Sequence, residues 1–194
     1  MAAFTLIELI VVILIIAVLM TLAFPAFQGL QNQMKRAQAR NDLVQIVTAV
    51  NAFYTEYGKY PLATSDTIYG PAATSNAALF NELRATATQT QNPRQIIFIS
   101  PPDAKDPARP RSGIGTSAGA GQFFDPWGAP YHVEIDGNYN NQIDANPYSA
   151  NAGSSSLRAG VIAWSFGKDT QSQSTSTPSD KNTGTNKDDV ISWQ

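Results

Sequence analysis

A short stretch in the last third of the chain carries a series of oxygen-bearing side chains. Its members, spaced two residues apart, are Asp136, Asn138, Asn140, Gln142 and Asp144. Carboxylate and amide oxygens at this spacing can surround a hard cation such as calcium, which takes about six to eight oxygen ligands. Residues 136–144 are therefore a candidate calcium loop, although an Asn- and Asp-rich turn without a metal has the same composition.

The stretch resembles the beginning of an EF-hand-type calcium loop. Asn141 stands where that loop has its central glycine, and Asn tolerates the left-handed backbone needed there. Pro147 stands where the loop has its closing Glu. The pattern thus predicts a calcium loop with a weakened end, or a hairpin connection that needs no ion.

A second candidate is a lone acid at the other end of the chain. Glu8 is the one ionisable side chain before Lys35, and it stands at the edge of an almost wholly apolar run, residues 9–24. A carboxylate in apolar surroundings is costly unless it is paired, protonated or close to water. Glu8 therefore either sits in a polar boundary or awaits a cationic partner from a terminal amine or another chain.

Composition excludes several classes of protein. The chain of 194 residues has no Cys, one His and a net charge of -2. It therefore has no disulfide, no thiol catalyst and no Cys-based metal centre, and its charge gives no basis for binding nucleic acid. We expect His132, in the middle of a predicted strand, to be a surface or packing residue, and we do not expect an enzyme.

The apolar run predicts a membrane-spanning helix. Counted from Phe4 to Phe24, before Pro25, it is about 31 Å long as a helix, close to the thickness of a bilayer core. A cleaved secretory signal is the alternative, but the basic start and the small-residue cleavage site are missing. We therefore expect a single-pass protein of the bacterial inner membrane with its C-terminal domain in the periplasm.

The string Phe-Thr-Leu-Ile-Glu-Leu at 4–9, with its apolar continuation and Pro25, resembles the N-terminus of type IV pilins and type II secretion pseudopilins. The resemblance implies a leader at 1–3, cut between Ala3 and Phe4 by a prepilin peptidase, and methylation of the new amine. It makes Glu8, with Thr5 and Pro25, the assembly residues, Glu8 neutralising the Phe4 amine of a neighbour. Ala3 departs from the usual Gly, and the leader lacks the usual basic residue.

Beyond Pro25 the helix becomes one-sided. Its segments are a membrane or filament-core part at 4–25 and an amphipathic part at 26–60. The apolar positions expected to face a soluble domain are Leu43, Ile46, Val47, Val50, Phe53, Tyr54 and Tyr57. Gly58 can end the helix in the left-handed conformation, and Pro61 bars its continuation. Pro25 marks either a bend or a segment that melts in a filament.

The remainder divides into a variable region at 61–122 and a C-terminal antiparallel sheet at 123–194. In the first we expect a short helix at 76–86, a strand or buried anchor at 96–99 and a loop at 101–121. In the second we expect strands at 131–135, 160–166 and 190–193, with the three Trp residues in the sheet core. Together these elements predict an α+β fold, a long helix packed on a small sheet.

Asp-Pro-Trp-Gly-Ala-Pro-Tyr at 125–131, with the ending of the chain, resembles the major pseudopilins of type II secretion. That resemblance implies the pilin fold and a calcium site, for which the matching positions are Asp169, Asp188 and Asp189. Without an ion these three residues would form a solvated acidic face. The absence of cysteine favours the pseudopilin branch over the pilins.

The sequence therefore predicts a subunit that polymerises into a pilus-like filament, with calcium as its candidate cofactor. The implied partners are other copies of the chain, the prepilin peptidase, the secretion or pilus assembly machinery, minor pseudopilins and the membrane, but no nucleic acid. A type IV pilin of a surface fibre and a membrane-anchored binding domain that never polymerises are the alternatives.

Overall fold

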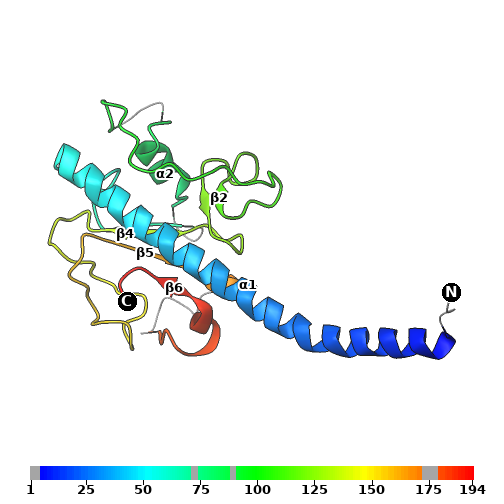
Figure 1. The fold of residues 1–194 in the computed structure, drawn as a ribbon. Helices are drawn as coiled ribbons and strands as arrows, with labels where there is room; N and C mark the ends of the chain where they lie inside the picture. Colours follow the sequence, from blue (N-terminus) through cyan, green and yellow to red (C-terminus); the bar gives the residue numbers. More distant parts are fainter. Residues whose placement is uncertain (1–4, 71–73, 88–90, 172–178) are drawn as a thin grey trace. The chain divides into compact units, whose positions relative to one another are not determined.

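The computed structural model describes residues 5–70, 74–87, 91–171 and 179–194, apart from the side chains of residues 22–26. The chain divides into two compact units, Met1–Lys35 and Arg36–Gln194. Helix α1 (Leu6–Tyr57) contributes its first part to one unit and its last part to the other. Figure 1 shows the elements of both units.

In the second unit, residues 36–57 of α1 form one wall of the domain. Their buried side chains are spaced three or four residues apart and are fully shielded from solvent; they are Ala39, Leu43, Ile46, Val50 and Phe53. This spacing puts them on one face of a helix, as predicted. Tyr54 departs from the prediction, because its side chain is exposed and stacks on Tyr60 with ring centroids 4.5 Å apart.

The end of α1 is the one that the sequence predicts. Gly58 has a φ of +66°, in the left-handed region, and its N–H donates to the carbonyl of Tyr54 at 2.8 Å. No atom outside the neighbouring backbone lies within 4 Å of where a Cβ would stand on Gly58. Backbone conformation rather than space therefore favours glycine at this position.

The main sheet is antiparallel and has the strand order β1-β4-β5-β6. Its strands are β1 (Thr67–Tyr69), β4 (His132–Ile135), β5 (Val161–Ser165) and β6 (Val190–Ile191). The three strands predicted in the C-terminal region are confirmed. The edge strand β1 comes from the region predicted to be irregular, so the sheet is not confined to residues 123–194.

Both faces of this sheet are covered. Val133 and Ile135 of β4 pack with α1 in the larger core, and Figure 1 shows α1 lying across β4 and β5. Trp164 and Ile162 of β5 belong to a second core on the other face, built with residues of the segment that follows β4. All residues of β4 and β5 are therefore buried, whereas a strand with one solvated face would alternate between buried and exposed.

The Asp-Pro-Trp-Gly turn fixes the entry to β4. Asp125 is fully buried, and its Oδ1 accepts the backbone N–H groups of Trp127, Gly128 and Ala129 at 2.7–2.9 Å. Its Oδ2 accepts the hydroxyl of Ser165 at 2.5 Å. One carboxylate thus satisfies a whole turn and ties it to β5, which explains why the motif needs an Asp at its start.

The region 61–122 contains more structure than the sequence suggests. Helix α2 (Ala77–Leu83) confirms the predicted short helix, with Leu79, Phe80 and Leu83 buried. Strands β2 (Gly113–Ile114) and β3 (Phe123–Phe124) form a separate antiparallel pair. Residues 96–99 are not a strand; Ile99 is buried while the side chain of Ile97 is 64% exposed, so this segment is a buried anchor.

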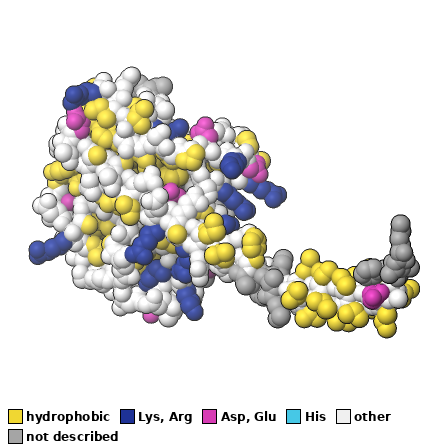
Figure 2. Space-filling model, viewed as in Figure 1, with side chains coloured by type: hydrophobic (Ala, Val, Ile, Leu, Met, Phe, Trp, Pro, Cys, Tyr) yellow, Lys and Arg dark blue, Asp and Glu magenta, His cyan; other side chains and the backbone are white. Residues whose placement is uncertain are grey.

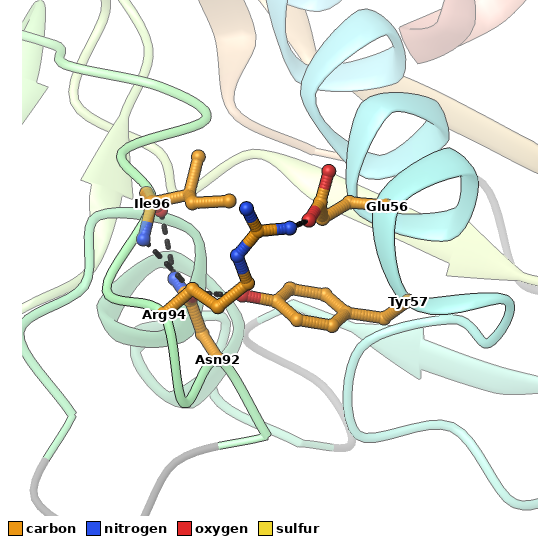
Figure 3. A network of polar contacts seen from close by, with 5 residues as sticks. All are labelled: Glu56, Tyr57, Asn92, Arg94 and Ile96. Atoms are coloured by element: carbon orange, nitrogen blue, oxygen red, sulfur yellow. Dashed lines mark hydrogen bonds and ion pairs between the residues drawn. The ribbon is translucent and has the colours of Figure 1, made fainter.

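A polar network joins this region to the end of α1 (Figure 3). The hydroxyl of Tyr57 donates to Oδ1 of Asn92 at 2.5 Å, and that same oxygen accepts the N–H of Ile96 at 3.0 Å. Arg94 forms an ion pair with Glu56. The network holds the irregular segment against the helix without regular secondary structure.

The architecture is therefore α+β: a long helix, a short one, a small antiparallel sheet and a separate strand pair. This confirms the predicted fold class at that level. Two short 3₁₀ helices, η1 (Gly167–Asp169) and η2 (Gly184–Asp188), lie in the connection between β5 and β6 and carry Asp169 and Asp188.

The predicted membrane span is wrong. Among the described residues, no helix combines the length and the apolar character needed to cross a membrane. The single-pass inner-membrane location with a periplasmic domain, which rested on the count from Phe4 to Phe24, is corrected accordingly.

Candidate functional site

The N-terminal candidate consists of Thr5 and Glu8, which form a reciprocal cap at the start of α1. The backbone N–H and the hydroxyl of Thr5 both donate to Oε2 of Glu8, at 2.8 and 2.6 Å. The N–H of Glu8 donates to the Thr5 hydroxyl oxygen at 3.3 Å. This is a capping box, and its Thr-x-x-Glu signature was already visible in the sequence.

The cap sets the charge of Glu8. The hydrogen bonds from the Thr5 side chain and backbone hold the pKa of Glu8 below its ordinary value, so the group is a carboxylate at neutral pH. Ala3 and Phe4, the predicted processing positions, lie outside the described residues. Pro25 lies within α1, and its side chain is also outside the described part.

Apolar side chains surround Glu8 along the first unit. Their exposed fractions range from 45% to 75% in residues 6–20, and they point to every side of the helix; they include Leu6, Ile7, Leu9, Val12, Leu14, Ile15, Val18, Leu19 and Met20. Figure 2 shows these side chains covering the visible face of this stretch. A helix that is apolar all around is normally covered by something else.

The acidic candidate predicted from family resemblance is brought together by the fold. Each of Asp169, Asp188 and Asp189 offers a carboxylate oxygen, and these three oxygens lie within 4.8 Å of one another. Asp169 and Asp188 belong to η1 and η2, and Asp188 also accepts the N–H of Asp169 at 3.0 Å. Residues 19 positions apart in the chain thus converge because the two 3₁₀ helices pack together.

Asp189 is the most unusual member of this cluster. It is 2% exposed, and its Oδ2 accepts the hydroxyl of Tyr148 at 2.5 Å while its Oδ1 has no partner among the described residues. Burial raises the pKa of Asp189 to about 7, and the neighbouring carboxylates of Asp188 and Asp169 add to the shift. An unpaired buried carboxylate oxygen beside two other carboxylates is a set of ligands that a calcium ion could use.

Asp189 also lines a cavity of about 420 Å³. It is lined by Arg36 and Arg40 from α1, by Lys181, and by residues of the chain's last segment. Arg36 donates to the carbonyl of Lys187 at 3.0 Å and Lys181 to that of Asn186 at 3.3 Å. These bonds orient two of the cationic side chains that line the cavity together with Asp189.

The loop 136–144 does not arrange its predicted ligands as a calcium loop would. Asp136 is buried, and its two oxygens accept the N–H groups of Asn140 and Asn141 at 3.2 and 2.8 Å, so it stabilises the turn. The amide nitrogens of Asn138, Asn140 and Gln142 all donate to Asp144, at 2.8–3.2 Å. Asn141 has the predicted left-handed conformation, with a φ of 65°.

Two acidic residues beside this loop were missed by sequence reasoning. Asp66, just before β1, accepts the N–H groups of Gly137 and Asn138 at 3.2 and 3.3 Å. Glu134 of β4 is 4% exposed and carries a buried Oε2 with no partner among the described residues. The pairing of β1 with β4 brings Asp66 here, and no local sequence signal predicts that pairing.

His132 is a packing residue, as expected. It is buried between Trp164 and Phe166, with ring centroids 5.1 and 4.2 Å away, and neither ring nitrogen has a partner among the described residues. Burial lowers the pKa of His132 to about 4. Trp127 and Trp164 lie in the two cores, and Trp193 packs against the second, as predicted for the sheet core.

Comparison of the sequence with family models and with curated proteins, and of the structure with solved structures, returns no significant match.

Proposed function

We propose that this chain is the structural subunit of a pilus-like filament, similar to the major pseudopilins of type II secretion, and that its small domain adopts the pilin fold. The observation that carries the proposal is the exposed apolar surface on every side of residues 6–20. Each Leu, Ile or Val that becomes fully covered contributes about 1.5–3 kcal/mol. Copies of the same helix, bundled side by side, provide that cover.

Glu8 supports the same proposal. It lies beside this apolar surface, and no Lys or Arg occurs in the chain before Lys35. In a bundle its carboxylate needs a cation, and the resemblance supplies one, the amine of Phe4 on a neighbouring copy after a prepilin peptidase has removed residues 1–3. Assembly machinery and minor pseudopilins are the further partners that this function implies.

Calcium is the cofactor that we propose for the domain, held by Asp169, Asp188 and Asp189. The closeness of the three carboxylates and the unpaired oxygen of Asp189 support this assignment. When bound, the ion supplies positive charge where three acids meet and ties η1 to η2 and the start of β6. We propose that its role is structural, because its ligands come from η1, from η2 and from the residue before β6, the segments that the ion would join.

The capping box allows a sharp test of Glu8. Glu8→Gln keeps a side chain that can cap Thr5 but removes the charge, whereas Thr5→Ala removes the cap and keeps the charge. We expect Glu8→Gln to abolish filaments in electron micrographs and Thr5→Ala, which keeps the charge, to reduce them less. Trp fluorescence should report a folded domain in both variants. Normal filaments from Glu8→Gln would overturn the proposed role of the charge.

The absence of cysteine makes cross-linking a second test. A single Leu14→Cys variant should give disulfide-linked multimers in the assembled state, because Leu14 lies in the bundled stretch. Ile97→Cys, on the exposed surface of the domain, is the matched control and should give far fewer. Isolated monomers from both variants would exclude a filament. Long surface fibres, as opposed to short assemblies, would favour a type IV pilin over a secretion pseudopilin.

A further inference from the structure

The cavity of about 420 Å³ in the second unit is lined mainly by cationic and apolar side chains. Arg36 and Arg40 lie one turn apart on the same face of α1, and Lys181 comes from the connection between β5 and β6. Figure 2 shows Lys and Arg side chains gathered on the visible face of the domain, in the area that α1 and β6 occupy in Figure 1. Residues far apart in the chain thus place three positive charges around one cavity.

These three positive charges are not balanced by acidic side chains. In the part of the chain that the structure describes, no side-chain carboxylate forms an ion pair with any of them. Asp189 is the one acidic residue among the described residues of the lining, and its Oδ2 accepts the hydroxyl of Tyr148. Asp169 and Asp188 do not line the cavity. Three cations against one carboxylate leave two positive charges in excess.

Main-chain oxygens hold the two arginine side chains in place. Arg36 donates from Nη2 to the carbonyl of Lys187 at 3.0 Å. Arg40 donates from Nη2 to the main-chain oxygen of Gln194. A guanidinium group has five N–H donors, so each arginine keeps further donors for a ligand. Because these side chains are already oriented, a ligand that binds them loses less free energy to ordering them.

The rest of the lining is largely apolar. Ala37 of α1 and Val190 and Ile191 of β6 contribute to it. Pockets for small organic molecules have volumes of about 300–1,000 Å³ and combine apolar walls with a few polar groups. The size and lining of this cavity therefore fit an anion that carries an organic group better than a bare ion.

We propose that this cavity binds a small organic phosphate, with its phosphate group held by Arg36, Arg40 and Lys181 and its organic part against the apolar wall. Guanidinium groups suit phosphate because they form two parallel N–H···O bonds to it. A phosphate ester carries close to two negative charges above a pH of about 6, which matches the two excess positive charges. The bound ligand joins α1 to β6 and to the segment before it.

The proposal depends neither on filament formation nor on the calcium cluster. Isothermal titration with phenyl phosphate therefore uses the unassembled full chain in mild detergent at pH 8, with EGTA present, and should show one molecule bound per chain. Inorganic phosphate, which has the charge without the ring, should bind several times more weakly. Equal affinities for the two would assign the cavity to free phosphate and overturn the role of the apolar wall. Benzenesulfonate, which has the ring with a single negative charge, should bind at least about tenfold more weakly than phenyl phosphate.

Substitutions test the charges one by one. Arg36→Gln and Arg40→Gln should each weaken the binding of phenyl phosphate about tenfold, because each removes charged hydrogen bonds. Asp189→Asn removes the acid of the lining and should tighten binding instead. Arg109→Gln, which changes an exposed cation outside the cavity, should leave binding unchanged.

Thermal melting separates loss of the ligand from loss of the fold. Both arginine side chains are exposed, so each variant should melt close to the unmodified chain when no ligand is present. Phenyl phosphate should raise the melting temperature of the unmodified chain and not that of a chain carrying both substitutions. Absence of phenyl phosphate binding at millimolar concentration would overturn the proposal, and so would unchanged binding in both arginine variants or equally tight binding of benzenesulfonate.

Discussion

Residues 6–20 and residues 36–57 belong to the same helix and are both rich in Leu, Ile and Val, yet their side chains have opposite surroundings. In the first stretch these side chains are exposed on every side of the helix. In the second, those spaced three or four residues apart are buried against the sheet, and polar residues occupy most of the rest. The apolar face of residues 36–57 is therefore covered by the chain's own sheet. The apolar side chains of residues 6–20 stay exposed and form a surface that another molecule could cover.

The largest expected effect is the loss of domain stability when a buried side chain of residues 36–57 is truncated. The matched truncation in residues 6–20 should leave that stability unchanged. Phe53 is fully buried and packs on Tyr57 and Phe98, with ring centroids 4.7 and 5.2 Å away. Phe53→Ala should lower the free energy of unfolding of the domain by about 3–5 kcal/mol. Leu14→Ala should change it by less than about 0.5 kcal/mol and should weaken filament assembly instead.

Urea unfolding followed by Trp fluorescence measures both effects, since all three Trp residues lie in the second unit. A loss of several kcal/mol of domain stability in Leu14→Ala would break the comparison. It would mean that residues 6–20 stabilise the domain itself.

Residues 6–20 and the domain of the second unit should also differ in their response to acid. Glu8 is exposed, whereas His132 is buried with a pKa lowered to about 4 from 6.5. Between pH 6.5 and 4, His132 is protonated in the unfolded chain but neutral in the folded chain. Stability is therefore lost as the pH falls from 6.5 to 4. The size of this loss is roughly 3 kcal/mol.

The measurement is the difference in unfolding free energy between the chain and His132→Phe, taken with a chelator present. Other titrating groups are common to both proteins and cancel in the difference, including buried acids whose raised pKa values act in the opposite direction. We expect the unmodified chain to lose stability relative to His132→Phe as the pH falls. A difference that is constant between pH 7 and 4 would show that His132 is accessible to protons in the folded state.

The smallest expected effect compares two glycines of the helix. Gly58 has a left-handed backbone at its end, and Gly29 lies in its interior; a Cβ on either would meet no atom within 4 Å. Gly58→Ala should therefore destabilise the domain by about 1 kcal/mol, through conformation alone. Gly29→Ala should raise the helix propensity by up to about 1 kcal/mol without affecting the domain. Thermal melting should detect the first change, and circular dichroism the second; equal effects on melting would contradict the assignment.

The helix, its end at Gly58 and three strands of the sheet could be predicted because their signals are local. The spacing of Leu43, Ile46, Val50 and Phe53 defines a helical face, and Gly58 and Pro61 define its end. The membrane span was predicted wrongly. It rested on a count of apolar residues from Phe4 to Phe24, whereas no helix among the described residues is long and apolar enough to cross a membrane. The Thr5–Glu8 cap also has a local signature, Thr-x-x-Glu, but the prediction for Glu8 rested on its charge alone.

Family resemblance implied that Asp169, Asp188 and Asp189 were candidate ligands, and the local spacing of side-chain oxygens pointed to residues 136–144. Which of these oxygens lack a hydrogen-bond partner depends on the fold. Asp136 is taken up by its own turn, while Glu134 and Asp189 are buried with an oxygen unpaired. The reason is that burial and partnership depend on strands and turns distant in sequence. Asp66, just before β1, accepts N–H groups of Gly137 and Asn138, and Tyr148 reaches Asp189 from 41 residues away.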